Sequence, residues 1–228
     1  MFFNPPISAV SATLGFIAAC VFSCRIYESH KKVKQIFTHY FFIAVVNFAI
    51  VTGLLGLVPL FFPRNFGLWK ISDCFVHIFL ILNLAYLWRF YLSLTKSPRE
   101  KLIFWTFLVI GQIFTLIDFI YPKTPYLANP GVIIWNNIPV VGIGIGVFIT
   151  LGSLPLAFYF FSEGKTKEFL VKTRLFLFTI FFAAFGLGGV FITIFLHPLI
   201  VLFGDSLILI GALGMLSASL LRYFVKID

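Results

Sequence analysis

The sequence predicts an all-α membrane protein, a seven-transmembrane helix bundle with its amino terminus outside the cytoplasm and its carboxyl terminus inside. Three observations lead to this prediction. The 228 residues are 61% hydrophobic and only 11% charged, a composition that suits a lipid solvent better than water. Seven apolar runs are each long enough to cross a bilayer, and the basic residues that separate them gather on alternate sides.

The predicted helices follow from the length of each apolar run and from the charge or proline that ends it. A bilayer core of about 30 Å requires roughly 20 helical residues. The first run has no basic residue before it and several after it, which is typical of an uncleaved helix that starts outside. We expect helices over residues 7–27, 38–62, 71–94, 102–121, 132–161, 175–196 and 205–224. No linker separates them, so residues 1–228 are expected to form a single domain.

The basic residues are sorted between the loops in a way that sets the orientation of the helices. Of the 17 lysines and arginines, only Arg64, Lys70 and Lys123 fall on the predicted outer side. The positive-inside rule assigns the remaining basic residues to the cytoplasm. A miscounted helix would scramble this alternation, so the charges also support the number seven. Because topology accounts for the net charge of +9, nucleic-acid binding is disfavoured.

Ionisable residues inside a membrane are costly unless they are paired or hydrated, so they are the first candidates for a site. Asp73 and His77 lie four residues apart and share a helix face. Asp118, His197 and Asp205 also lie near predicted outer helix ends. One interpretation is an outward-facing pocket in which these five residues converge on a cation, a metal or a polar ligand. Alternatively, the aspartates are hydrated, Asp205 caps its helix and His77 bonds a neighbour.

Three amide side chains lie nearer the middle of the membrane. Asn47, Asn83 and Gln112 would be costly in lipid and are expected to face the interior of the bundle. Their simplest role is hydrogen bonding between helices, and the alternative is contact with a substrate. No carboxylate occupies the middle third of any predicted helix. This argues against an ordinary ion-coupled carrier but leaves a uniporter open.

We expect no catalytic residues, metal or cofactor. A retinal protein would need a lysine in the last helix, and residues 205–224 contain none. The histidines are divided between the sides, His39 inside and His77 and His197 outside, which disfavours a seven-helix zinc hydrolase. The three cysteines have neither metal-site nor disulfide spacing. An intramembrane hydrolase is the one enzymatic alternative, although Ser153 lacks a Gly-x-Ser-Gly-like setting.

The end of the chain carries a family resemblance. After the last apolar run, the pair Arg222-Tyr223 precedes a short apolar and acidic stretch, 224–228. Together with seven outward-starting helices, this resembles the amino-terminal seven-transmembrane sensor region of prokaryotic histidine kinases. The resemblance implies a signal-input module in the cytoplasmic (inner) membrane of a prokaryote. Because no kinase domain follows in this chain, it also implies a cytoplasmic signalling partner or a homo-oligomer.

A second interpretation comes from a faint internal similarity between the two halves of the chain. Helices one to three and five to seven each place a proline in the outer loop and an aspartate at the third helix, Pro63 and Asp73 against Pro198 and Asp205. This layout is similar to the small sugar transporters built as three helices, a linker helix and three more, although the Pro-Gln pairs of that family are absent. The alternative function is therefore a small-solute transporter or facilitator.

Overall fold

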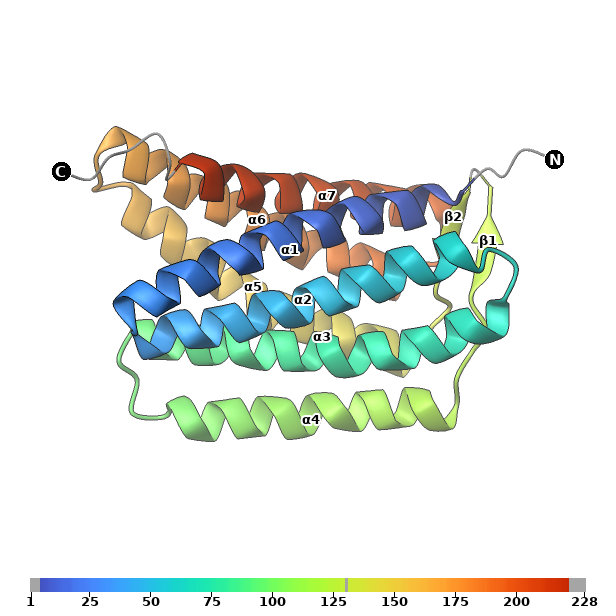
Figure 1. Cartoon of the computed structure of the whole chain (residues 1–228). Helices are drawn as coiled ribbons and strands as arrows, with labels where there is room; N and C mark the ends of the chain where they lie inside the picture. Colours follow the sequence, from blue (N-terminus) through green and yellow to red (C-terminus); the bar gives the residue numbers. More distant parts are fainter. Residues whose placement is uncertain (1–4, 130, 222–228) are drawn as a thin grey trace.

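The computed structural model describes residues 5–129 and 131–221 and contains seven helices that are long and apolar enough to cross a membrane (Figure 1). It confirms the predicted seven-helix bundle and its multi-pass membrane character. The pair Arg222-Tyr223 and the stretch 224–228 lie outside the described residues. The helices are α1 (Ile7–Val33), α2 (Ile36–Phe61), α3 (Phe66–Leu94), α4 (Glu100–Ile120), α5 (Pro139–Gly164), α6 (Phe169–Ile194) and α7 (Pro198–Leu220).

The predicted start of the fifth helix at residue 132 is wrong. Residues Val132–Ile134 form the strand β2, which pairs antiparallel with β1 (Tyr126–Ala128). Three buried apolar residues look the same in the sequence of a helix and of a buried strand. The helix begins at Pro139, because proline needs no hydrogen-bond partner in the first turn and holds the residue before it extended.

Three other helices begin at least five residues earlier than predicted, and one of them is α6, which starts at Phe169 rather than at 175. Asn65 caps α3, its side-chain oxygen accepting the backbone N–H of Leu68 at 3.0 Å, so this helix starts five residues before the expected position 71. Helix α7 starts at Pro198 rather than at 205. Asp205 consequently lies inside the helix, and the alternative in which it caps the helix is wrong.

Six helices form a closed ring, and α4 lies outside it. Neighbours in the sequence pack together as α1–α2–α3 and as α5–α6–α7, while contacts of α7 with α1 and of α3 with α5 close the ring. Helix α4 touches α3 and α5 from the outside and is the least buried of the seven. Figure 1 shows it as a separate layer along one edge of the bundle. The chain thus consists of two groups of three helices, α1–α3 and α5–α7, with α4 lying at the periphery between them.

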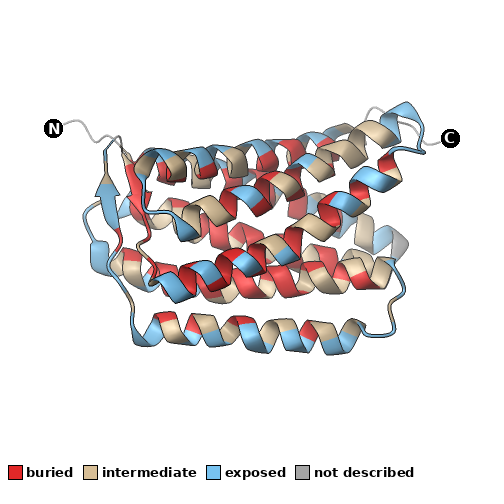
Figure 2. Cartoon of the chain, turned by 180° about the vertical axis from the view of Figure 1, so that it is seen from behind, coloured by how far each residue is buried: buried red, intermediate tan, exposed pale blue. Residues whose placement is uncertain are grey.

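The two ends of the bundle differ. One end, called here the hairpin end, carries the β-hairpin together with the loops at 62–65 and 195–197. The opposite, basic end carries the connections at 34–35, 95–99 and 165–168. Strand β2 is buried and β1 is largely exposed (Figure 2). The backbone N–H of Ile7 bonds the carbonyl oxygen of Gly131 at 2.8 Å, which fixes the hairpin over the start of α1.

Candidate functional site

Three of the predicted site residues meet at the interface of α3 and α4, in the half of the bundle towards the hairpin end. Asp73 and His77 share one face of α3, and Asp118 comes from the last turn of α4. Nδ1 of His77 lies 2.9 Å from Oδ2 of Asp118, at hydrogen-bond distance. Nε2 lies 3.9 Å from Oδ1 of Asp73. One ligand atom from each residue lies within 4.8 Å of the others, and we call this group the Asp–His–Asp cluster.

The cluster is buried and has more acidic than basic groups. Asp73, His77 and Asp118 are 5%, 2% and 3% exposed, so bulk water does not solvate the carboxylates. Even with a protonated imidazole, two carboxylates leave one negative charge, which is costly inside a protein unless a proton or cation balances it. Carboxylate oxygen and imidazole nitrogen are suitable ligands for divalent transition metals. The geometry can therefore hold a cation.

The chain matches no protein-family model, no characterised protein and no solved structure. Its function is therefore inferred from its own geometry.

The other two predicted site residues lie elsewhere. Asp205 faces α1, where its Oδ2 accepts the hydroxyl hydrogen of Ser8 at 2.5 Å and its backbone oxygen accepts that of Ser11 at 3.2 Å. His197 is exposed and directly precedes α7. Helix α7 packs against α1 and α6, whereas the Asp–His–Asp cluster lies between α3 and α4. The structure thus brings three of the five residues together and assigns Asp205 to a separate interface.

The mid-membrane amides make the contacts expected of interhelical polar residues, with one exception. Nδ2 of Asn83 donates to the carbonyl oxygen of Ala44 on α2 at 2.7 Å. Nε2 of Gln112 on α4 donates to the carbonyl oxygen of Ile78 on α3 at 3.4 Å. Asn47 instead donates within its own helix. Oδ1 of Asn83 is buried and has no hydrogen-bond partner among the described residues, so it is available to a donor.

Helix α4 is also fastened at the basic end, by a contact that sequence reasoning missed. Nε of Arg89 on α3 lies 3.0 Å from Oε1 of Glu100, the first residue of α4. The guanidinium group lies over the rings of Tyr40 and Phe104, 4.3 and 4.9 Å from their centroids. The position of Arg89 one turn and a half inside an apolar run was the signal that it has a partner.

Proposed function

We propose that the chain is a non-enzymatic, sensor-like membrane module that responds to a divalent cation at the Asp–His–Asp cluster. The observation that supports this proposal is the convergence of two buried carboxylates and an imidazole from two helices within 4.8 Å. Such a group gains from a bound cation because the cation removes the uncompensated negative charge. The resemblance to the membrane region of histidine kinases points to the same class of function.

Helix α4 is the element through which the cluster would act. It is peripheral, and polar contacts hold it to α3 near both ends, His77–Asp118 at one and Arg89–Glu100 at the other. A cation that coordinates Asp73, His77 and Asp118 together replaces the hydrogen bond and changes how α4 sits on α3. A ligand shifts such an equilibrium only by binding one arrangement better than the other. The connection at 95–99 then carries the change to the cytoplasmic side and a partner.

The test is metal binding by the purified chain in lipid nanodiscs, with Zn²⁺ and Mn²⁺ as probes. We expect one ion per chain by isothermal titration, and at least tenfold weaker binding in His77→Ala and Asp118→Asn. His197→Ala is the matched control, because that histidine is exposed at the same end. Hydrogen exchange at 95–101 should change with the ion in the unmodified chain and not in Asp118→Asn. Equal binding by all variants would refute the proposal.

A small-solute facilitator is the second candidate. The peripheral position of α4 between two groups of three helices favours it, and so does the buried, unpartnered Oδ1 of Asn83, which could accept a solute hydroxyl. A facilitator should raise the flux of radiolabelled sugars or polyols into liposomes, and Asn83→Ala should abolish that flux. Asn47→Ala serves as the control because, among the described residues, the side chain of Asn47 bonds within its own helix. A sensor should show no flux above that of empty liposomes.

A further inference from the structure

Cys74 is a buried thiol beside the Asp–His–Asp cluster, and the cation response described above does not use it. Its side chain is a free thiol and is 6% exposed. Sγ of Cys74 donates to Oδ2 of Asp118 at a distance of 4.0 Å, a weak hydrogen bond of the kind that thiols make. The same oxygen lies 2.9 Å from Nδ1 of His77. A thiol and an imidazole of α3 therefore converge on one carboxylate of α4.

The spacing of three residues on α3 explains this convergence. A helix turns by about 100° per residue, so Asp73, Cys74 and His77 fall within an arc of about 100° on one face. His77 lies one turn further along and between the other two in angle. Because side chains lean towards the amino terminus of a helix, the imidazole leans back over the turn that carries the acid and the thiol. Asp118 faces this group from the last turn of α4.

The distances suit a four-coordinate metal ion. Zinc binds sulfur at about 2.3 Å and nitrogen or oxygen at about 2.0–2.2 Å, so its ligand atoms at tetrahedral angles lie about 3.3–3.7 Å apart. Oδ2 of Asp118 is 2.9 Å from the His77 nitrogen and 4.0 Å from the Cys74 sulfur. These separations lie on either side of that range, so coordination requires shifts of about half an ångström. A carboxylate oxygen of Asp73 lies within 4.8 Å of the ligand atoms of His77 and Asp118 and completes the set of four.

We propose that Cys74 is the fourth ligand of the cation site and that the site selects Zn²⁺ over Mn²⁺, Mg²⁺ and Ca²⁺. The inference rests on the proposed function, because it specifies the ion to which the same cluster responds. Carboxylates suit magnesium, calcium and manganese, whereas a thiolate favours zinc. When the ion binds, a metal–sulfur bond forms and the thiol proton leaves to the solvent, with no change of oxidation state.

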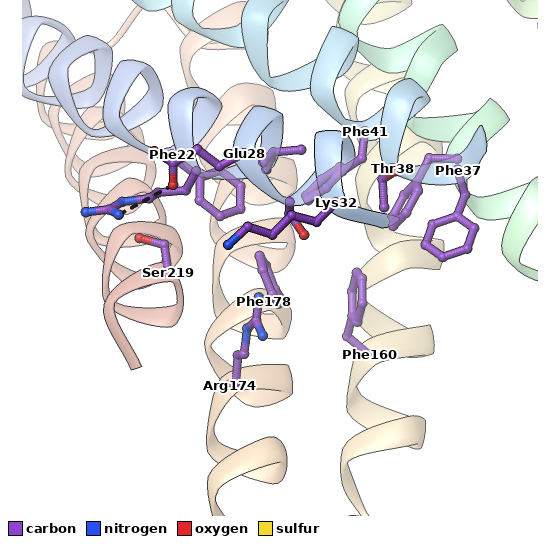
Figure 3. A pocket seen from close by; sticks show the side chains of 14 residues that line it. Phe22, Glu28, Lys32, Phe37, Thr38, Phe41, Phe160, Arg174, Phe178 and Ser219 are labelled. Atoms are coloured by element: carbon purple, nitrogen blue, oxygen red, sulfur yellow. Dashed lines mark ion pairs between the residues drawn. The ribbon is translucent and has the colours of Figure 1, made fainter. Parts of the chain in front are cut away.

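A pair of histidines at the basic end offers a competing place for a metal ion. The rings of His30 on α1 and His39 on α2 have centroids 5.3 Å apart. Nδ1 of His30 lies 2.9 Å from Oγ1 of Thr38, and Thr38 lines a cavity of about 340 Å³ at this end (Figure 3). Cys24 is six residues before His30 on the same helix, a rise of about 9 Å. An ion held by the two histidines therefore lacks a sulfur ligand from Cys24, and sulfur coordination distinguishes the two places.

Absorption spectroscopy with Co²⁺ as the probe tests the sulfur ligand in the full chain in lipid nanodiscs. Cobalt occupies zinc sites, and a thiolate bound to it gives a near-ultraviolet charge-transfer band that oxygen and nitrogen ligands do not give. We expect this band in the unmodified chain and its disappearance when excess Zn²⁺ displaces the cobalt. The band should be absent in Cys74→Ser. The matched controls, which should keep it, are Cys20→Ser, Cys24→Ser and the double variant His30→Gln/His39→Gln.

The outcomes separate this inference from the proposed function. Cobalt binding that is lost in His77→Ala but shows no charge-transfer band in the unmodified chain would overturn the thiolate ligand and leave the cation response intact. Absence of any cobalt or zinc binding would overturn both. A band that persists in Cys74→Ser would place the sulfur ligand at another cysteine and refute the assignment. Since the unmodified chain already gives the deciding spectrum, the test does not depend on the folding of a variant.

Selectivity is measured by isothermal titration of the same nanodiscs with Zn²⁺ and with Mn²⁺. Cys74→Ser should weaken zinc binding at least tenfold and change manganese binding less than twofold, because the variant loses only the ligand that zinc prefers. Cys74→Ala, which also lacks sulfur, should behave in the same way. Equal losses for the two ions would assign Cys74 a structural role and contradict the selectivity. Zinc binding that stays unchanged in both variants would contradict it as well.

Discussion

The hydroxyl group of Ser8 donates to Oδ2 of Asp205 at 2.5 Å and accepts the backbone N–H of Ile133 at 3.2 Å. One side chain therefore joins the first helix, the last helix and the buried strand of the hairpin. Buried polar groups of this kind are costly when a partner is removed. The Ser8–Asp205 contact closes the helix ring at the hairpin end.

Ser8→Ala should lower the free energy of unfolding by about 1–3 kcal/mol, because the Asp205 carboxylate and the Ile133 N–H both lose this partner. The measurement is denaturant unfolding of the purified chain in mixed micelles. Ser206→Ala is the control, since within the described part of the chain that exposed hydroxyl donates to the Leu202 carbonyl of its own helix. If both variants unfold alike, the contact does not hold the ring together.

Arg89→Lys should loosen the basic end of α4. Lysine keeps the charge opposite Glu100 but loses the flat guanidinium that lies over Tyr40 and Phe104. We expect a loss of about 1 kcal/mol in unfolding free energy and faster hydrogen exchange at the start of α4. Arg99→Lys, at an exposed arginine in the connection that follows α3, should change neither quantity. Unaltered exchange in Arg89→Lys would show that this contact does not secure α4.

Gly188→Ala should destabilise the α6–α7 interface. A methyl group at Gly188 would lie 2.7 Å from the carbonyl oxygen of Gly204, and one at Gly204 would lie 2.8 Å from that of Gly188. Because the obstacle is backbone, the helices must move apart, at a cost of about 1–3 kcal/mol. Gly15→Ala is the control, since its nearest atom would be a Thr52 methyl at 3.6 Å. Equal thermal stability of the two variants would contradict this close approach.

A divalent cation that binds the Asp–His–Asp cluster should also stabilise the fold. At a free concentration of 100 times its Kd, a ligand of the native state adds about 2.7 kcal/mol. Thermal unfolding with Zn²⁺ should therefore occur at a higher temperature than with EDTA. Asp118→Asn should remove the difference while keeping the shape of the side chain. A Zn²⁺ effect of the same size in Asp118→Asn would place the ion elsewhere.

Membrane orientation can be tested by cysteine labelling in a variant whose native cysteines, Cys20, Cys24 and Cys74, are replaced by serine. The positive-inside rule predicts that Lys123→Cys reacts with an impermeant maleimide in intact cells and that Lys96→Cys reacts only after lysis. Both positions are exposed, Lys96 in the connection between α3 and α4 at the basic end and Lys123 between α4 and β1 at the hairpin end. Reaction of both sites in intact cells would contradict the predicted topology.

The number and order of the helices could be predicted from the sequence because each depends on a local property, the length of an apolar run. The hairpin could not, since Val132–Ile134 has no polar residue whose spacing separates a strand from a helix. Gly131, which adopts a φ of 90° in the turn, was a weaker signal of a reversal in the sequence. Pro139 falls inside the predicted helix 132–161, whereas it is the first residue of α5.

The candidate site was only partly predictable. Helical spacing pairs Asp73 with His77, but which carboxylate faces them from another helix depends on packing, and this selected Asp118 rather than Asp205. The sequence did not predict the cavity of about 340 Å³ at the basic end, because the phenylalanines that line it come from five different helices. They include Phe22, Phe41, Phe90, Phe160 and Phe178. In the sequence they are indistinguishable from the other phenylalanines of a chain that has 32.

The link between the ends of the chain also constrains how the protein is made. Ser8 and Asp205 are 197 positions apart, and ribosomes add about 5–20 residues per second. The first helix therefore waits on the order of 10–40 seconds in the bilayer before its hydrogen-bond acceptor has been synthesised. During that interval its inward face has lipid or a chaperone as neighbour. Ring closure is consequently a late, post-insertion event, and a nascent chain released before the final span would leave an open bundle for quality-control proteases to recognise.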